Sequence, residues 1–185
     1  MPLRQQVEVG WCVPASVLMC AEYFANKVGW YDKAFALYDI PSQENYIHEK
    51  LDSYGGTTFY PNSSNGAPKS ISRFLYGHLN ITNENMALLN TSYFCEEYTG
   101  ALLLIMNQIR YEKKPLISVV SEAANAFHAV VITGYQEDSA SETVKKVFYN
   151  DPWYGNRNKS KFEWQRYSCI SDVRYMTLYF DDYNK

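Results

Sequence analysis

The segment from Gln5 to Phe24 places the strongest constraint on how this chain folds. A short polar stretch leads to Cys12, and Pro14 follows two residues later. Proline suits the first turn of a helix, because its missing backbone N–H would have no partner there. Apolar residues then recur at helical spacing through Phe24, and Gly29 can end the helix. We therefore predict a buried helix that begins at Cys12.

A cysteine at a helix start has chemical as well as structural consequences. The helix dipole and the free N–H groups of the first turn both stabilise a thiolate, which is the nucleophilic form of cysteine. Gln6 lies six residues before Cys12, and its side-chain amide can donate to an oxyanion at the carbon under attack. Gln5 is the fallback donor, although its offset of seven directs the side chain elsewhere. The alternative interpretation of Cys12 is a buried cysteine that only fills the helix start.

The composition fits one globular domain over residues 1–185. Of the 185 residues, 46% are hydrophobic and 20% are charged, a balance that allows a sizeable core. A net charge of −3 gives no reason to expect nucleic acid or an anionic membrane as a partner. The longest purely apolar run, Ala101–Met106, is far too short to span a bilayer.

The four cysteines indicate neither a metal site nor a disulfide framework. No pair has metal-ligand spacing such as C-x-x-C, so we expect no metal, and thiol chemistry needs no organic cofactor. If Cys12 is free, the three others, Cys20, Cys95 and Cys169, cannot all pair with one another. Cys20 falls on the apolar face of the first helix and is interpreted as a core residue.

Helices come first along the chain and strands later, which predicts an α+β fold with an antiparallel sheet. The clearest strand is the apolar run 128–135. The region 30–51 predicts one or two shorter helices, broken at Ile40-Pro41-Ser42. The other predicted elements are helices over 71–79 and 99–113, and strands over 115–120, 144–150 and within 167–180.

Three histidines occur, and His128 is the candidate partner for Cys12 because it begins the clearest strand. His48 lies in a polar helical context and His78 lies near a helix end. We interpret both of these as exposed surface residues.

A hairpin places an acid beside His128. If 128–135 and 144–151 pair, His128 lies opposite Asp151 at the open end, where facing Cβ atoms are about 4.5–5.5 Å apart. A bulge would bring Asn150 to this position instead. Adjacent strand residues point to opposite faces, so only one of the two can face the ring, and we predict that it is Asp151.

Such an acid would hold the imidazole in one tautomer and stabilise the imidazolium. The other ring nitrogen of His128 could then face Cys12 and favour a thiolate–imidazolium pair. Separately, each residue has a plain structural explanation, an edge histidine and a simple turn at Asp151-Pro152. Together they predict a nucleophilic cysteine site.

These residues resemble those of papain-like cysteine peptidases, whose functional residues follow the order Gln, Cys, His, then Asn or Asp. The runs His128–Tyr135 and Asn150–Gly155, with its Asp-Pro-Trp turn, are similar to the compact bacterial branch. That branch includes staphopain-like enzymes, type III effector peptidases and bacteriocin-leader peptidases. The neighbours of Cys12 depart from plant papains, because Trp11 precedes it. The similarity is good at the two ends of the chain and poor over about 30–100, the part that normally shapes the substrate cleft.

The resemblance implies a papain-like fold, with a helical half carrying Cys12 and a sheet half carrying His128 and Asp151. A cleft between the halves would bind an extended polypeptide, and the activity implied is peptide hydrolysis with Gln6 in the oxyanion hole. We expect a monomer, secreted or delivered outside the producing cell as most bacterial members are. Two alternatives stay open: acyl transfer, transpeptidation or deamidation with the same residues, or a domain that only binds peptides.

Overall fold

The structure is a computed structural model of the 185-residue chain. It describes residues 1–58, 66–79, 86–91, 99–111, 114–123, 126–140, 143–160, 163–164 and 175–180. Cys95 and Cys169 lie outside these residues.

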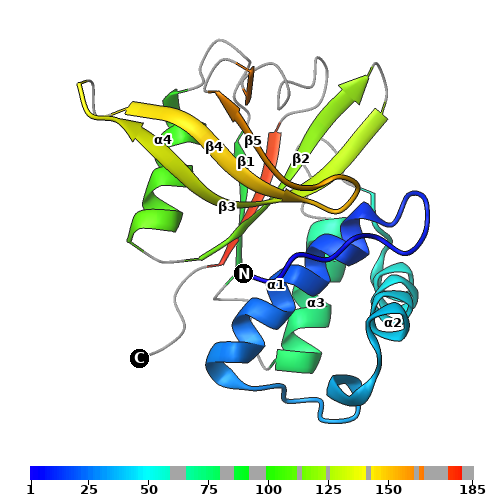
Figure 1. The fold of residues 1–185 in the computed structure, drawn as a ribbon. Helices are drawn as coiled ribbons and strands as arrows, with labels where there is room; N and C mark the ends of the chain where they lie inside the picture. The colour runs from blue at the N-terminus through cyan, green and yellow to red at the C-terminus, as the bar shows by residue number, and fades with distance from the viewer. Residues whose placement is uncertain are drawn as a thin grey trace.

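The predicted α+β class is confirmed, with a group of helices packed on a six-stranded antiparallel sheet (Figure 1). The helices are α1 Cys12–Val28, the short 3-10 helix η1 Phe35–Leu37, α2 Ile40–Tyr54, α3 Ala67–Leu79 and α4 Thr99–Arg110. The strands are β1 Met86–Thr91, β2 Leu116–Ala123, β3 Ala126–Asp138, β4 Thr143–Asp151, β5 Gly155–Ser160 and β6 Tyr175–Phe180. Their order in the sheet is β1-β6-β2-β3-β4-β5.

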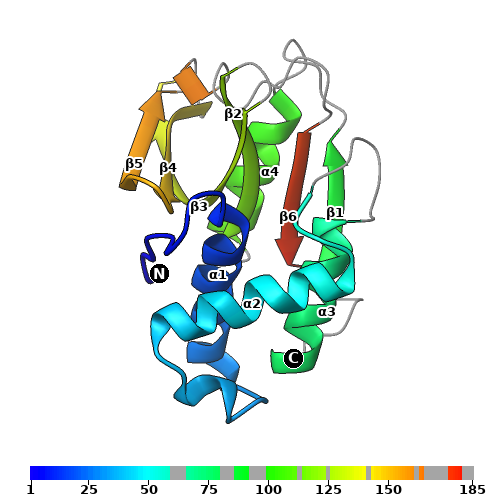
Figure 2. The same cartoon turned by 90° about the vertical axis from the view of Figure 1, so that its right-hand side faces the viewer.

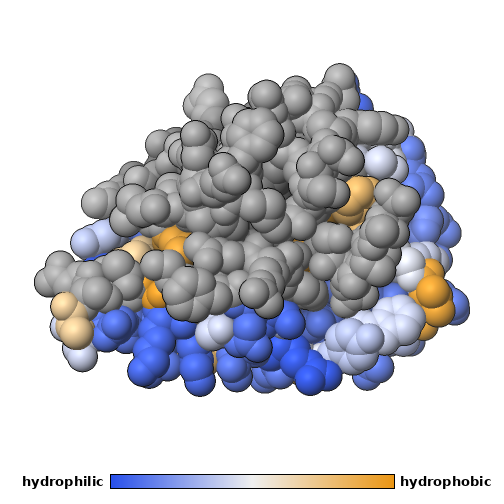
Figure 3. All heavy atoms as spheres, turned by 90° about the horizontal axis from the view of Figure 1, so that it is seen from above, coloured by the Kyte–Doolittle hydropathy of each residue, from blue (hydrophilic) through white to orange (hydrophobic). Residues whose placement is uncertain are grey.

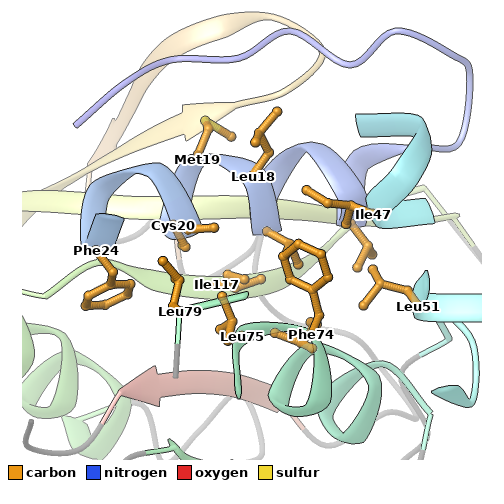
Figure 4. Packing of buried hydrophobic residues seen from close by; sticks show 14 of the residues in the cluster. Leu18, Met19, Cys20, Phe24, Ile47, Leu51, Phe74, Leu75, Leu79 and Ile117 are labelled. Atoms are coloured by element: carbon orange, nitrogen blue, oxygen red, sulfur yellow. The ribbon is translucent and has the colours of Figure 1, made fainter. Parts of the chain in front are cut away.

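Helix α1 forms the centre of the helical half, as its apolar spacing predicts. Val17, Cys20 and Phe24 are fully or almost fully buried, and residues of α2, α3 and β3 pack around them (Figure 4). Burial of one large apolar side chain contributes about 1.5–3 kcal/mol, so this cluster fixes α1 firmly. Figure 2 shows α2 running across α1 and α3 on the side away from α4.

The two faces of the sheet cover two different cores. Ala129 and Val131 on β3 pack on the helical half, whereas Val130 and Ile132 pack in a second cluster with residues of α4 and β4. This follows from the alternation of side chains along a strand. Buried on both faces, β3 is a rigid base for the residues at its ends, including His128.

The predicted register of the β3–β4 hairpin is wrong. In the structure Val131 lies opposite Asn150, so by continuation Asp151 falls opposite Val130 and not opposite His128. Asp151 is therefore a diagonal neighbour of His128 on the same face, which is still within reach of long side chains. β3 is longer than the predicted strand, and the pairing shifts twice along the hairpin. One shift falls at Gly134, and a glycine inside a strand often accompanies a bulge.

Further differences concern helix starts and two strands. Pro41 was interpreted as a break, but it lies in the first turn of α2, where Asp39 caps the helix by accepting from the Ser42 N–H. The third helix begins at Ala67, before the predicted start. Strands β1 and β5 were not predicted.

Candidate active site

Cys12 is the first residue of α1 and is partly exposed. The first turn holds no acidic side chain, and Trp11 at the N-cap supplies no side-chain hydrogen bond. The positive end of the helix dipole is therefore available to the Cys12 sulfur. Cys20, two turns further along the helix, is fully buried, and burial raises the pKa of its thiol. The two thiols of α1 thus differ in access and in chemistry.

His128 lies near the start of β3 and is almost fully buried. Its Nε2 atom is 2.7 Å from Oδ1 of Asp151, which is the histidine–acid contact predicted from the sequence. Because Nε2 is engaged by the carboxylate, Nδ1 is the nitrogen left for the thiol. Burial alone lowers the pKa of His128, but hydrogen bonds to Asp151 and Cys12 outweigh it and raise the pKa to about 10.

Asp151 ends β4 with only 2% of its surface exposed. Besides the His128 ring, Oδ1 accepts from the backbone N–H groups of Trp153 at 2.8 Å and Tyr154 at 3.3 Å. Burial raises the pKa of Asp151, but these donors and the imidazole outweigh it, and the pKa lies below its usual value. The carboxylate is thus held both in position and in its charged form.

Asn150, the predicted alternative to Asp151, does not face the ring. Its Nδ2 donates to the Pro2 carbonyl at 3.1 Å and lies 3.7 Å from the Met19 sulfur on α1. Asn150 therefore points toward the N-terminal segment and the helical half.

Gln6 lies on the N-terminal segment, which runs beside the β4–β5 end of the sheet and then turns back into α1 (Figure 1). Its backbone N–H donates to the Pro152 carbonyl at 2.9 Å, so Gln6 is fixed next to the residue that follows Asp151. Its side-chain Nε2 donates to the Glu8 carbonyl at 2.8 Å. An amide nitrogen carries two hydrogens, so one is left to donate to a bound group. Gln5 is exposed.

Comparisons with known proteins place the chain in a family. The sequence profile described as the Peptidase_C39 like family matches residues 1–173. The chain belongs to this family. Among solved structures, the C39-like chain is similar to a double glycine motif protease from an AMS/PCAT transporter in complex with the leader peptide, with a TM-score of 0.52 and 15% sequence identity. The alignment covers 98% of this chain and 91% of that one. No curated protein matches significantly.

The other two histidines of the C39-like chain each contact a carboxylate of their own. His48 on α2 packs on the Trp11 ring, with centroids 4.5 Å apart, and its Nδ1 is 3.2 Å from Asp52. His78 was predicted to be exposed, and this is wrong: it is buried among aromatic rings, with Nδ1 2.8 Å from an Asp32 carboxylate oxygen. His78 lies near the C-terminal end of α3, next to Gly77, and this end of the helix packs inward. The glycine gave no sign of that burial.

A pocket of about 440 Å³ lies between the segment before Cys12 and the first half of α2. Val7 and Trp11 line one side, and Tyr46 lines the other. Cys12 itself does not line the pocket, although Trp11 directly precedes it in the chain. The walls also carry the polar or charged residues Glu8, Ser42, Asn45 and Glu49, so the pocket is of mixed character.

The described part of the chain offers no group of three His, Cys, Asp or Glu side chains that could hold a metal ion. Within the same residues, no helix is both long and apolar enough to cross a bilayer. Figure 3 shows one face of the molecule, on which the coloured residues are mainly hydrophilic and the hydrophobic patches are small and separate.

Glu44 is a residue near the site that the sequence analysis missed. It is fully buried on α2, and its Oε1 accepts from the Val7 N–H at 2.9 Å. A signal existed, because Glu44 shares the core-facing helical spacing of Ile40, Ile47 and Leu51. An acid at such a position is unusual unless it has a specific partner.

Proposed function

We propose that the protein is a cysteine peptidase with Cys12 as nucleophile, His128 as general base and acid, and Asp151 as the residue that orients the imidazole. The single observation that carries the proposal is the position of His128, which hydrogen-bonds Asp151 at 2.7 Å and also interacts with the Cys12 thiol. A cysteine at a helix start, oriented against an acid-bound histidine, is the arrangement that thiol-based acyl transfer requires.

In the proposed reaction the Cys12 thiolate attacks the carbonyl carbon of a peptide bond. A C–S bond forms, and the carbonyl electron pair moves onto oxygen, where the Gln6 amide and the Cys12 backbone N–H stabilise the oxyanion. The oxyanion then re-forms the carbonyl, the C–N bond breaks, and the His128 imidazolium protonates the departing amine. Water, deprotonated by His128, attacks the thioester and releases the acid and the thiolate.

We propose an extended polypeptide as the substrate. The similar solved structure is a double glycine motif protease in complex with a leader peptide, which supports a peptide for this chain as well. Two exposed apolar side chains lie close in sequence to proposed site residues: Val7 follows Gln6 and Trp153 lies two residues after Asp151, both at least 42% exposed. Such side chains can pack on a peptide backbone and its apolar residues. Action outside the producing cell stays a prediction from the resemblance.

The test is incubation with a peptide library, with products identified by mass spectrometry. Wild-type protein is expected to release pairs of fragments with free carboxyl ends, and Cys12→Ala is expected to release none while it keeps its fold. Ligated or deamidated peptides in place of fragments would favour acyl transfer or deamidation. Binding without any product would favour a peptide-binding domain.

A further inference from the structure

Glu44 is a buried carboxyl group for which the proposed chemistry has no use. It lies on α2, and none of its surface is exposed. One oxygen, Oε1, accepts from the Val7 N–H. The other, Oε2, is buried without a hydrogen-bond partner among the described residues. A buried polar oxygen without a partner destabilises the fold. Because Glu44 is buried in spite of this cost, its one hydrogen bond, to the Val7 N–H, is the contact to explain.

The segment before Cys12 is held on several elements. The Pro2 carbonyl accepts from Asn150 on β4, and Arg4 makes two hydrogen bonds, of 2.7 and 2.8 Å, to Glu22 on α1. Two further contacts come from consecutive amides: the Gln6 N–H donates to Pro152 beyond β4, and the Val7 N–H donates to α2.

The last two contacts bear directly on the oxyanion donor. Gln6 lies between a bond to the sheet half, through its own N–H, and a bond to the helical half, through the N–H of Val7. Fixing the backbone on both sides of a residue restricts the directions its side chain can take. The Arg4 contact lies two residues earlier and cannot replace the bond at Val7.

We infer that Glu44 is a positioning residue for the oxyanion hole, which it maintains by holding the Val7 N–H and, through it, the orientation of the Gln6 amide. The inference rests on the proposed function for its effect on turnover, but the contact between Glu44 and the segment can be tested without activity. Glu44 touches neither substrate nor the reacting atoms in this role.

The test compares three variants of α2 in the full chain. Glu44→Leu removes the acceptor, whereas Glu44→Gln keeps an oxygen for the Val7 N–H. The matched control is Gln43→Leu, because Gln43 is the next buried polar residue on the same helix and donates to the Phe35 carbonyl at 3.2 Å instead of contacting the segment.

For Glu44→Leu, kcat on a cleaved peptide is expected to fall about tenfold to a hundredfold with little change in KM, since misplacement of a catalytic group acts on the transition state. Alkylation of Cys12 by iodoacetamide should not change, because that reaction forms no oxyanion. Glu44→Gln should keep most of the activity, as should Gln43→Leu. The losses from Glu44→Leu and Gln6→Ala should not add in the double variant, because both act through the Gln6 amide.

Hydrogen exchange at the Val7 amide separates this inference from the proposed function. Glu44→Leu should speed exchange there and Gln43→Leu should not, even if no peptide is ever cleaved. Unchanged protection of Val7 in Glu44→Leu would overturn the inference, whatever the enzyme does. Equal losses of kcat in Glu44→Leu and Gln43→Leu would also overturn it, because they would show a general effect on α2.

Discussion

At the scale of single residues, Asp151 has two tasks that depend on one oxygen. Oδ1 accepts from His128 Nε2 and from two backbone N–H groups of the turn that follows. The turn therefore fixes the carboxylate, and the carboxylate fixes the ring. Because the side chain is buried, its charge acts on the imidazole with little screening by water.

The first prediction concerns the pH dependence of kcat/KM. The pKa of His128 is raised to about 10, because hydrogen bonds to Asp151 and Cys12 outweigh the effect of burial. The imidazolium therefore persists from acid up to that pH, and activity should decline as pH rises through it. Asp151→Asn keeps an acceptor oxygen but removes the charge, so this alkaline limb should move to lower pH. A limb that stays in place would contradict the assigned role of Asp151.

The second prediction compares the rates at which the four cysteine thiols are alkylated. Near neutral pH, Cys12 should react with iodoacetamide faster than Cys20, Cys95 or Cys169, because it joins a helix start to an imidazole. Cys20 is the internal control, since it lies on the same helix and is fully buried. Peptide mapping by mass spectrometry gives the four rates. Similar rates at all four positions would argue against Cys12 as nucleophile.

The third prediction concerns Gln6. Gln6→Ala should lower kcat by about 10²–10³, the usual loss when one oxyanion donor is removed. The backbone N–H that bonds Pro152 is kept in this variant, so the thermal midpoint should change little. If activity falls only in proportion to unfolding, Gln6 has a structural role instead.

At the scale of elements, local signals were enough for α1 and β3. Their apolar spacing, with Pro14 and Gly29 near the ends of α1, is encoded in neighbouring residues. β5, with the sequence GNRNKS, has no apolar alternation and becomes a strand only because it pairs with β4. The hairpin register also depends on where two separate segments pair, and the two shifts along β3 and β4 moved Asp151 from the expected position opposite His128. Cys12, His128 and Asp151 could be predicted as a group because each lies at or near the end of an element that neighbouring residues encode.

The fourth prediction separates the last two residues of β4. Asn150→Ala removes the hydrogen bond to the Pro2 carbonyl, so the free energy of unfolding should fall by about 1 kcal/mol. The ring of His128 is not affected, so the alkaline limb of kcat/KM should stay where it is in wild type. Asp151→Ala should cost far more activity. A larger loss of activity in Asn150→Ala than in Asp151→Ala would reverse the assignment.

At the scale of the whole molecule, residues 1–11 connect the two halves that carry the proposed site. They bond to β4 and its following turn on one side and to α1 and α2 on the other. Cys12 comes from the helical half and His128 from the sheet half, so a segment bonded to both favours one relative placement of the two. A fully buried carboxyl at one of these bonds makes the stability of the whole fold depend on pH.

The fifth prediction concerns how the free energy of unfolding depends on pH. Burial raises the pKa of Glu44, against the smaller opposite effect of the Val7 N–H. A carboxyl whose pKa is higher in the folded state contributes stability that is fully present below its ordinary value of 4.5 and is lost as pH rises through the raised value. Glu44→Gln cannot ionise, so its free energy of unfolding relative to wild type should increase from about pH 4 towards neutral pH. Urea titrations at several pH values measure this difference, and Glu49→Gln, a change at an exposed acid on the same helix, is the control. A difference that stays constant with pH, or changes equally in the control, would show that Glu44 is not the group responsible.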